Sequence, residues 1–324
     1  MCLLVNGRTV ILGAISDEIG QTPEIVASTI SSWDPPPDVL GFRSAYGKKT
    51  HELTAELVGQ FRAGLPKGVS ICCLEGNLGK ADLHRLGVIE EQADYLRDRL
   101  LPWAELLGTE RIRLFGGNRY LDLPRMWPTV VRFVQQMFNV LNETPAGYEM
   151  GLSVETEFAT NVASLTYSEW PLLGSLQDHD YHRWGTILDP GNYVYNVEQV
   201  VAWGHGEEPT PTVRKRFSNR LEQEIAYCNQ NIAEVHVKDA ILDPPIRPRS
   251  VPLGEGLVPW PEILCKLAEV DFNGPYVLEC HLDPEGGELD EASRYQPGGD
   301  RYGNPAHATA AYETLCELIR EAYA

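Results

Sequence analysis

The sequence predicts a closed (β/α)8 barrel of the TIM type, an α/β fold in which eight strand and helix units form a ring. Short runs of β-branched residues recur along the 324 residues. Each run is followed by polar or glycine-rich residues and then by apolar residues at helical spacing. Eight such units are present, the number that a closed barrel requires. Because the pattern spans the whole chain, we expect a single domain over residues 1–324.

The expected strands are short and mostly apolar. They cover residues 9–15, 38–42, 69–74, 111–115, 149–154, 185–188, 232–237 and 276–278. Runs such as Ile71-Cys72-Cys73-Leu74 are apolar throughout, which is typical of parallel strands buried on both faces. A doubly wound sheet is the alternative, but it needs a G-x-G-x-x-G turn after the first strand. Residues 16–20 do not provide that turn.

Helix signals lie between these strands. Thr22 and Pro23 are expected to start one helix, as N-cap and first helical residue. Pro128 is expected to open the amphipathic run 129–141, and apolar positions near Leu315 mark a closing helix. Segments rich in proline and glycine lie at 203–211, 241–260 and 283–305. The last two follow strands 7 and 8, so we expect long loops at the face where barrel enzymes keep their sites.

The charge balance excludes two classes of partner. The chain has 27 basic and 46 acidic side chains, a formal net charge of −19. Nucleic acids and anionic membranes would be repelled, since no basic run is long enough to form a local binding patch. Seven cysteines without a CxxC pair argue against a disulfide framework. With no apolar stretch of about 20 residues and no basic leader, we expect a cytoplasmic protein.

Four of the expected strands end in a side chain that can bind a metal. They are Glu155, Asp189, His236 and Glu279, on strands 5 to 8. One acid at a strand end is usually a helix cap or a solvated loop residue, but four on consecutive barrel strands converge on the axis. Three carboxylates and one imidazole form a hard site. It suits one divalent cation, with Mn²⁺ the first choice and Mg²⁺ or Co²⁺ the alternatives.

Further motifs follow the remaining strands. They are Ser16-Asp17-Glu18, Arg43-Ser44-Ala45-Tyr46-Gly47-Lys48, Leu78-Gly79-Lys80, Glu155-Thr156-Glu157, Asp189-Pro190-Gly191-Asn192, His236-Val237-Lys238-Asp239-Ala240 with Gly254-Glu255-Gly256, and Glu279-Cys280-His281-Leu282. With these motifs the chain resembles, over nearly its whole length, the sugar phosphate isomerase/epimerase family of xylose isomerase-like TIM barrels, which includes ketose 3-epimerases.

The resemblance implies an activity and assigns roles to residues. It makes Glu155, Asp189, His236 and Glu279 the metal ligands, and it makes Glu155 and Glu279 the groups that move the proton. A sugar carbonyl and its neighbouring hydroxyl would chelate the cation, which stabilises an enediolate while the glutamates act as acid and base. The implied enzyme is a metal-dependent sugar isomerase or epimerase.

Two positions depart from the family pattern. Many ketose 3-epimerases have a histidine three residues after the aspartate ligand, where this chain has Asn192. The family often has a glutamate two residues before the arginine of the strand 2 motif, where this chain has Gly41. Both departures leave the metal ligands intact and bear on which substrate is bound.

Other polar residues have two interpretations each. Lys238 would polarise a substrate oxygen as a catalytic group, or it pairs with an acid. We assign substrate contacts to Asn192, His281, Arg43 and Asn118, although Arg43 would equally pair with an acid and Asn118 would equally be a turn residue. Glu157 points the same way as Glu155 by strand alternation. Glu157 and Asp239 are expected to lie outside the set of metal ligands and to hold residues of the site in position.

Three alternatives stay open. Proton abstraction next to a ketone also drives elimination, so a lyase acting on 3-keto-glycosides, as in C-glycoside deglycosidases with a small partner subunit, would use the same site. An abasic-site endonuclease would need more histidine ligands, for a trinuclear metal cluster, and a basic groove, whereas this chain has eight histidines in all and a net charge of −19. A non-catalytic metal-binding subunit is the last alternative. The acidic balance favours a neutral sugar or glycoside over a sugar phosphate, and association as a homo-oligomer is left open.

Overall fold

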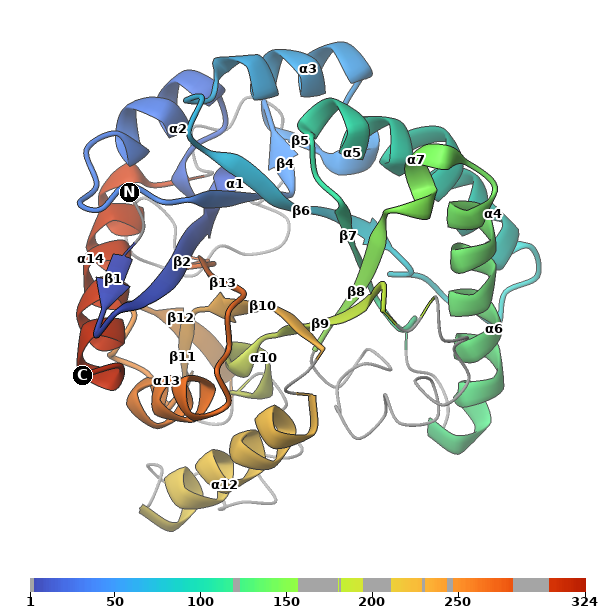
Figure 1. The fold of residues 1–324 in the computed structure, drawn as a ribbon. Helices are drawn as coiled ribbons and strands as arrows, with labels where there is room; N and C mark the ends of the chain where they lie inside the picture. The colour runs from blue at the N-terminus through green and yellow to red at the C-terminus, as the bar shows by residue number, and fades with distance from the viewer. Residues whose placement is uncertain are drawn as a thin grey trace.

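The computed structural model describes residues 3–118, 123–156, 180, 182–194, 211–228, 231–243, 247–281 and 303–324. A ring of strands lies at its centre, and helices surround the ring (Figure 1). None of the helices within these ranges is long and apolar enough to cross a membrane.

Eight parallel strands of the described chain form the barrel. They are β2 (Arg8–Ile15), β3 (Val39–Phe42), β6 (Ser70–Leu78), β7 (Arg111–Leu114), β8 (Gly151–Glu155), β9 (Trp184–Leu188), β10 (Ile232–Val237) and β13 (Pro275–Leu278). Each pairs in parallel with the next, and pairing of β2 with β3 and with β13 closes the ring. All eight predicted strands are therefore confirmed, together with the predicted barrel.

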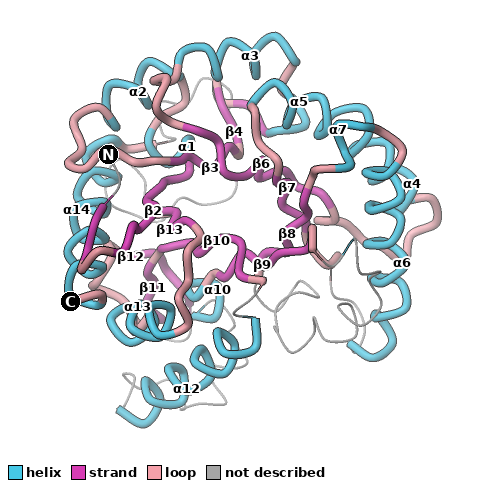
Figure 2. Tube along the Cα trace, in the orientation of Figure 1, coloured by secondary structure: helices cyan, strands magenta, loops and turns pink. Residues whose placement is uncertain are grey.

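Most of the helices form the outer layer, as the tube view shows (Figure 2). The helices are α1 (Ser16–Ile19), α2 (Pro23–Ile30), α3 (Ala55–Gly64), α4 (Val88–Tyr95), α5 (Leu101–Leu107), α6 (Leu123–Asn142), α7 (Pro145–Tyr148), α10 (Pro190–Val194), α12 (Pro211–Cys228), α13 (Trp260–Glu269) and α14 (Pro305–Ala322). The short α1 and α10 are buried beside the strands. A π-helical turn, Leu96–Leu100, joins α4 to α5, and a 3₁₀ turn covers Thr50–Glu52. Short strands add β1 (Leu3–Val5), antiparallel to β2, and the pair β4 (Ser44–Ala45) and β5 (Lys48–Lys49).

The helix expectations are confirmed with one exception. Helix α2 begins at Pro23 with Thr22 as its N-cap, although the Thr22 side chain makes no capping hydrogen bond. The start at Pro128 is wrong, because α6 begins at Leu123 and contains Pro128 in its interior. Met126 lies on the same apolar face as Val130 and is fully buried. Because the turn before Pro128 packs into the core, the helix includes the proline in its interior.

The segment after barrel strand 7 is more regular than expected. In place of a long irregular loop, β11 (Asp239–Asp243) and β12 (Arg247–Val251) form an antiparallel hairpin. Pro248 is tolerated in β12 because a two-stranded ribbon leaves one side of each strand without a partner. Most of the expected loops at 203–211 and 283–305 lies outside the described residues.

Candidate metal centre

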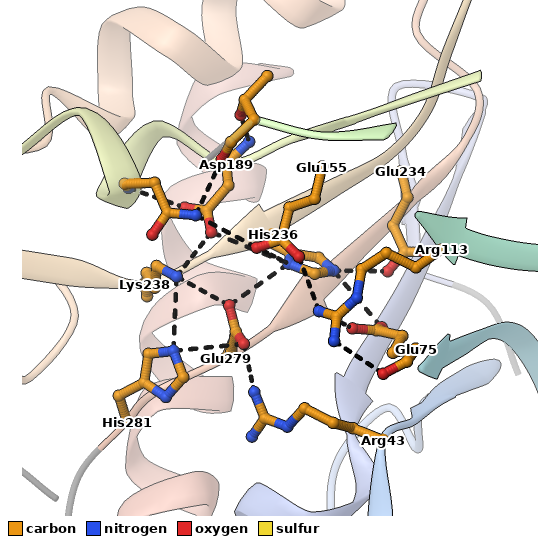
Figure 3. Close-up of polar contacts among 12 residues, drawn as sticks. Arg43, Glu75, Arg113, Glu155, Asp189, Glu234, His236, Lys238, Glu279 and His281 are labelled. Carbon is orange, nitrogen blue, oxygen red and sulfur yellow. Dashed lines mark hydrogen bonds and ion pairs between the residues drawn. The ribbon is translucent and has the colours of Figure 1, made fainter. Parts of the chain in front are cut away.

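The four predicted metal-binding side chains come together at the carboxyl end of the barrel (Figure 3). Glu155 ends β8, Asp189 follows β9, His236 lies near the end of β10, and Glu279 follows β13. One atom from each lies within 4.8 Å of the others. All four residues are buried, so the barrel holds these charges away from solvent.

One ring nitrogen of His236 is the centre of this group. Its Nδ1 lies 3.8 Å from Glu155 Oε1, 3.9 Å from Asp189 Oδ2 and 3.4 Å from Glu279 Oε2. This nitrogen is buried and makes no hydrogen bond. One nitrogen and three carboxylate oxygens that face each other are a donor set for a hard divalent cation, so these residues fit the metal that the sequence predicts.

The electrostatics of the cluster also favour a cation. Burial raises the pKa of Asp189 to about 7, and the nearby Glu279 and Glu155 carboxylates add to this rise against the opposing effect of Lys238. Burial acts to lower the pKa of His236, but the surrounding carboxylates, Glu75 first, raise it well above its usual value. Neighbouring carboxylates contribute to both shifts, in addition to burial for Asp189 and against burial for His236.

The other ring nitrogen of His236 is held by two acids that the sequence analysis missed. Its Nε2 lies 3.0 Å from Glu234 Oε1 and 3.4 Å from Glu75 Oε1. A carboxylate on the second nitrogen fixes the orientation and tautomer of a metal-binding histidine. The signal for Glu234 was in the sequence, because Glu234 lies two residues before His236 on the same face of β10. Glu157, predicted to support the site, lies outside the described residues.

Glu75 also accounts for the departure at Gly41. A Cβ atom at position 41 would lie 2.2 Å from Glu75 Oε1, so any side chain there would displace this carboxylate. Gly41 is in β3, and Glu75 is in the neighbouring strand β6. The absence of a side chain at Gly41 thus leaves room for the carboxylate of Glu75 on the third barrel strand.

Two basic residues flank Glu279. Lys238 Nζ lies 2.9 Å from Glu279 Oε2 and 2.6 Å from Asp189 Oδ2. Arg43 pairs with Glu279 Oε1 and with Glu18, and it lies 3.1 Å from Asp17. Burial acts to raise the pKa of Glu279, but Lys238 and other neighbouring groups lower it well below its usual value. Both basic residues therefore pair with acids. This pairing is one of the two interpretations that the sequence allowed for each residue.

His281 is also within the cluster. Its Nδ1 lies 3.2 Å from Glu18 Oε1, its backbone N–H donates to Glu18 Oε2 at 3.1 Å, and its Nε2 lies 3.3 Å from Glu279 Oε1. The backbone of His281 has a φ of 52°, in the left-handed region that residues other than glycine seldom adopt. Strain of this kind is usually retained where a side chain must be aimed, and here the imidazole is aimed at Glu279.

Asn192, predicted to contact substrate, holds the ligands in place. Its Nδ2 donates to Glu155 Oε1 at 3.2 Å and to the Thr156 carbonyl at 2.9 Å, and its backbone N–H donates to Asp189 Oδ1 at 3.1 Å. Asn118 is half-buried beyond the end of β7, and its backbone N–H donates to the Ala81 carbonyl. A substrate contact by either residue stays a prediction.

Asp239 supports the hairpin that follows β10. Its two carboxylate oxygens accept hydrogen bonds from the backbone N–H groups of Ala240, Gly254, Gly256 and Val258, at 2.9 to 3.1 Å. Gly256 is required there, since a Cβ atom would lie 1.8 Å from Asp239 Oδ1. This contact explains why a glycine-containing loop accompanies the aspartate after Lys238.

Comparisons with known proteins agree with this architecture. The family model described as xylose isomerase-like TIM barrel matches residues 52–298. No curated protein matches the sequence. A xylose isomerase domain protein from Planctomyces limnophilus is 16% identical over 99% of both chains, with a TM-score of 0.62. D-psicose 3-epimerase from Clostridium cellulolyticum H10, solved with D-tagatose, is 11% identical over 96% of this chain and 100% of that chain, with a TM-score of 0.63.

A third similar structure contains a metal. The IOLI protein, solved with a bound zinc atom, is 12% identical over 88% of this chain and 89% of that chain, with a TM-score of 0.59. At these identities the solved structures demonstrate a shared fold.

Proposed function

Since the chain belongs to the family of xylose isomerase-like TIM barrels, we propose that it is a divalent-metal-dependent isomerase or epimerase of a neutral sugar or sugar derivative. The observation that carries this proposal is the set of three carboxylate oxygens that face His236 Nδ1 at 3.4 to 3.9 Å. The sugar epimerases among the similar structures support the same class of reaction.

Glu155, Asp189, His236 and Glu279 would hold the metal. When bound, the cation supplies Lewis acidity that polarises a substrate carbonyl. Oxygen-rich donors favour Mn²⁺, with Mg²⁺ or Co²⁺ as alternatives, and the zinc atom in the similar IOLI structure supports metal binding by a protein of this fold.

The two glutamates perform the proton transfer in this proposal. Glu155 and Glu279 end different barrel strands and approach the centre from different sides. One removes the proton from the carbon next to the substrate carbonyl, and the other returns a proton to the opposite face. The pKa of each is lowered despite burial, Glu155 chiefly by Arg113 and Glu279 chiefly by Lys238, so both are ionised and able to accept a proton near neutral pH.

The charge inventory of the site favours an uncharged substrate. Seven buried carboxyl groups are linked by contacts within the described residues, and the permanent cations linked to them are Arg43, Arg113 and Lys238. The seven acids are Asp17, Glu18, Glu75, Glu155, Asp189, Glu234 and Glu279. Each cation contacts at least two of these acids. A divalent ion leaves the cluster acidic, so a phosphate group would be repelled.

Deuterium exchange tests the proposal. The chelated and reloaded enzyme is incubated in D₂O with Mn²⁺ and a panel of free ketoses, the corresponding phosphates and 3-keto-glycosides. We expect deuterium next to the carbonyl of a free sugar together with an isomerised or epimerised product. Absence of exchange with every substrate under Mn²⁺, Mg²⁺ and Co²⁺ would refute the proposal, and release of an aglycone without an epimerised sugar would favour the lyase instead.

The Glu279→Gln variant tests the role of the second glutamate. We expect turnover to fall by about 10²- to 10⁴-fold while metal stays bound, because glutamine keeps a ligand oxygen but cannot carry the proton. Glu269→Gln is the matched control, because Glu269 lies on the exposed face of α13 and pairs only with Lys266 among the contacts described. Unchanged turnover in Glu279→Gln with metal bound would show that this glutamate does not move the proton.

A further inference from the structure

Each of the three ligand carboxylates has one oxygen tied to a donor of the protein. Glu155 Oε2 accepts a hydrogen bond from Arg113 at 2.7 Å, and Glu279 Oε1 accepts one from Arg43. Asp189 Oδ1 accepts the backbone N–H of Asn192 at 3.1 Å. These are not the oxygens that face His236 Nδ1, which are Glu155 Oε1, Glu279 Oε2 and Asp189 Oδ2. Every carboxylate therefore has one oxygen held away from the centre and one that points to it. The inward oxygens also have donors nearby: Asn192 Nδ2 donates to Glu155 Oε1 at 3.2 Å, and Lys238 Nζ lies 2.6 Å from Asp189 Oδ2 and 2.9 Å from Glu279 Oε2.

The arginine that tethers Glu155 is itself immobile. Arg113 donates from the same nitrogen to Glu75 Oε2 at 2.8 Å and from a second nitrogen to the Glu75 carbonyl at 2.7 Å. Its guanidinium also lies 4.9 Å from the centre of the Phe115 ring. A planar guanidinium held at several points cannot follow a carboxylate that rotates, so rotation of Glu155 would cost a buried charged hydrogen bond.

The arginine that tethers Glu279 is fixed in the same way. Arg43 is held by both oxygens of Asp17, at 3.1 Å each, and by Glu18. It reaches Glu279 from the end of β3, and one strand, β6, separates β3 from β7, which carries Arg113. Lys238 contacts the inward oxygen Glu279 Oε2, which has a second lone pair for a cation.

We propose that Arg113 and Arg43 are positioning residues that make Glu155 and Glu279 bind the metal through a single oxygen each. This inference rests on the proposed function, since it needs a cation at the site. Mn²⁺ and Mg²⁺ prefer about six ligands in octahedral geometry. Four single-atom ligands leave about two positions for substrate oxygens, whereas a glutamate that bound through both oxygens would occupy one of them.

Water-proton relaxation of bound Mn²⁺ measures the number of open positions directly. We expect about two exchangeable waters on Mn²⁺ in the wild type. In the charge-matched variant Arg113→Met/Glu75→Gln, Glu155 Oε2 loses its arginine while Asn192 still donates to Oε1, and we expect Oε2 to bind the metal as well, leaving about one water and a relaxivity reduced to about half. Arg43→Met/Asp17→Asn frees Glu279 in the same way. It provides an independent test if the first variant does not fold, as judged by circular dichroism.

An exposed pair on the outer helices provides the control. Arg97 pairs with Glu143 at 3.0 Å far from the barrel mouth, and Arg97→Met/Glu143→Gln makes the same chemical change. This control should keep about two waters. Mn²⁺ binding with an unchanged number of waters in a folded Arg113 or Arg43 variant would overturn the inference and leave the proposed function intact. Failure of the wild type to bind Mn²⁺, Mg²⁺ or Co²⁺ would overturn both.

Discussion

Replacing Asp239 by asparagine is expected to destabilise the protein through the loop beside the site. Four backbone N–H groups point at the Asp239 carboxylate, two at each oxygen. Ala240 and Val258 donate to Oδ1, and Gly254 and Gly256 donate to Oδ2. Asparagine keeps one oxygen and puts an NH₂ group in the other place. In either orientation of the amide, two backbone donors then face a donor.

The size of the effect follows from these contacts. A hydrogen bond to a charged acceptor contributes about 1.5 kcal/mol at the lower end of its range, so the loss of two amounts to about 3 kcal/mol. Asp239 is 1% exposed, so water cannot replace the lost acceptor. For a chain of 324 residues, an unfolding entropy of about 2.1 cal/mol/K per residue converts this loss into a decrease in Tm of about 4 °C.

Denaturant unfolding followed by circular dichroism measures this effect. Asp271→Asn is the matched control, because Asp271 is an exposed residue whose carboxylate pairs with Arg8 at 3.1 Å. Its free energy of unfolding should change by about 0.5 kcal/mol or less. If Asp239→Asn changed the free energy of unfolding no more than Asp271→Asn does, the four hydrogen bonds would not contribute to stability as argued.

Three other predictions test the described structure. Removal of divalent cations with a chelator should lower Tm, and an added cation at about 1,000 times its Kd should raise the free energy of unfolding by about 4 kcal/mol. A Tm that changes with neither treatment would contradict a metal site in the barrel. Gly41→Ala should cost about 1–3 kcal/mol, because the new methyl group meets Glu75 Oε1 at 2.2 Å, and the cost should shrink in a Glu75→Ala background when measured by a double-mutant cycle. Cys265 is exposed and should react with a thiol reagent in the folded protein. Burial raises the pKa of Cys73 and Cys280, so these two thiols should react only after unfolding. Equal reaction rates of the three cysteines in the folded protein would refute this prediction.

The barrel could be predicted from the sequence because its strands carry a strong local signal. Parallel strands covered on both faces are nearly continuous apolar runs, so their number and order were readable without any long-range information. The helix that contains Pro128 and the hairpin Asp239–Asp243 with Arg247–Val251 were not readable in this way. In both, tertiary packing or pairing outweighs the local preference of proline.

The residues proposed to bind the metal were predictable for a different reason. The ends of barrel strands meet at one place whatever the intervening sequence, so an acid or histidine at each end can be assigned from the chain alone. Glu75 and Arg113 lie within strands, and their function depends on which strands are neighbours and on the space left by Gly41. Unlike Glu234, which shares a strand face with His236, these two residues therefore carried no usable signal until the barrel was closed.

The buried acids behind the arginines have a physical purpose in the proposed chemistry. A carboxylate bound to an arginine that has no other partner would be a weak base, because the full positive charge would stabilise its ionised form. Glu155 shares Arg113 with Glu75, and Glu279 shares Arg43 with Asp17 and Glu18 of α1. Each arginine thus pairs with a second acid as well as with the carboxylate proposed to bind the metal. It can hold the ligand in position, while the second acid opposes the lowering of the ligand's pKa.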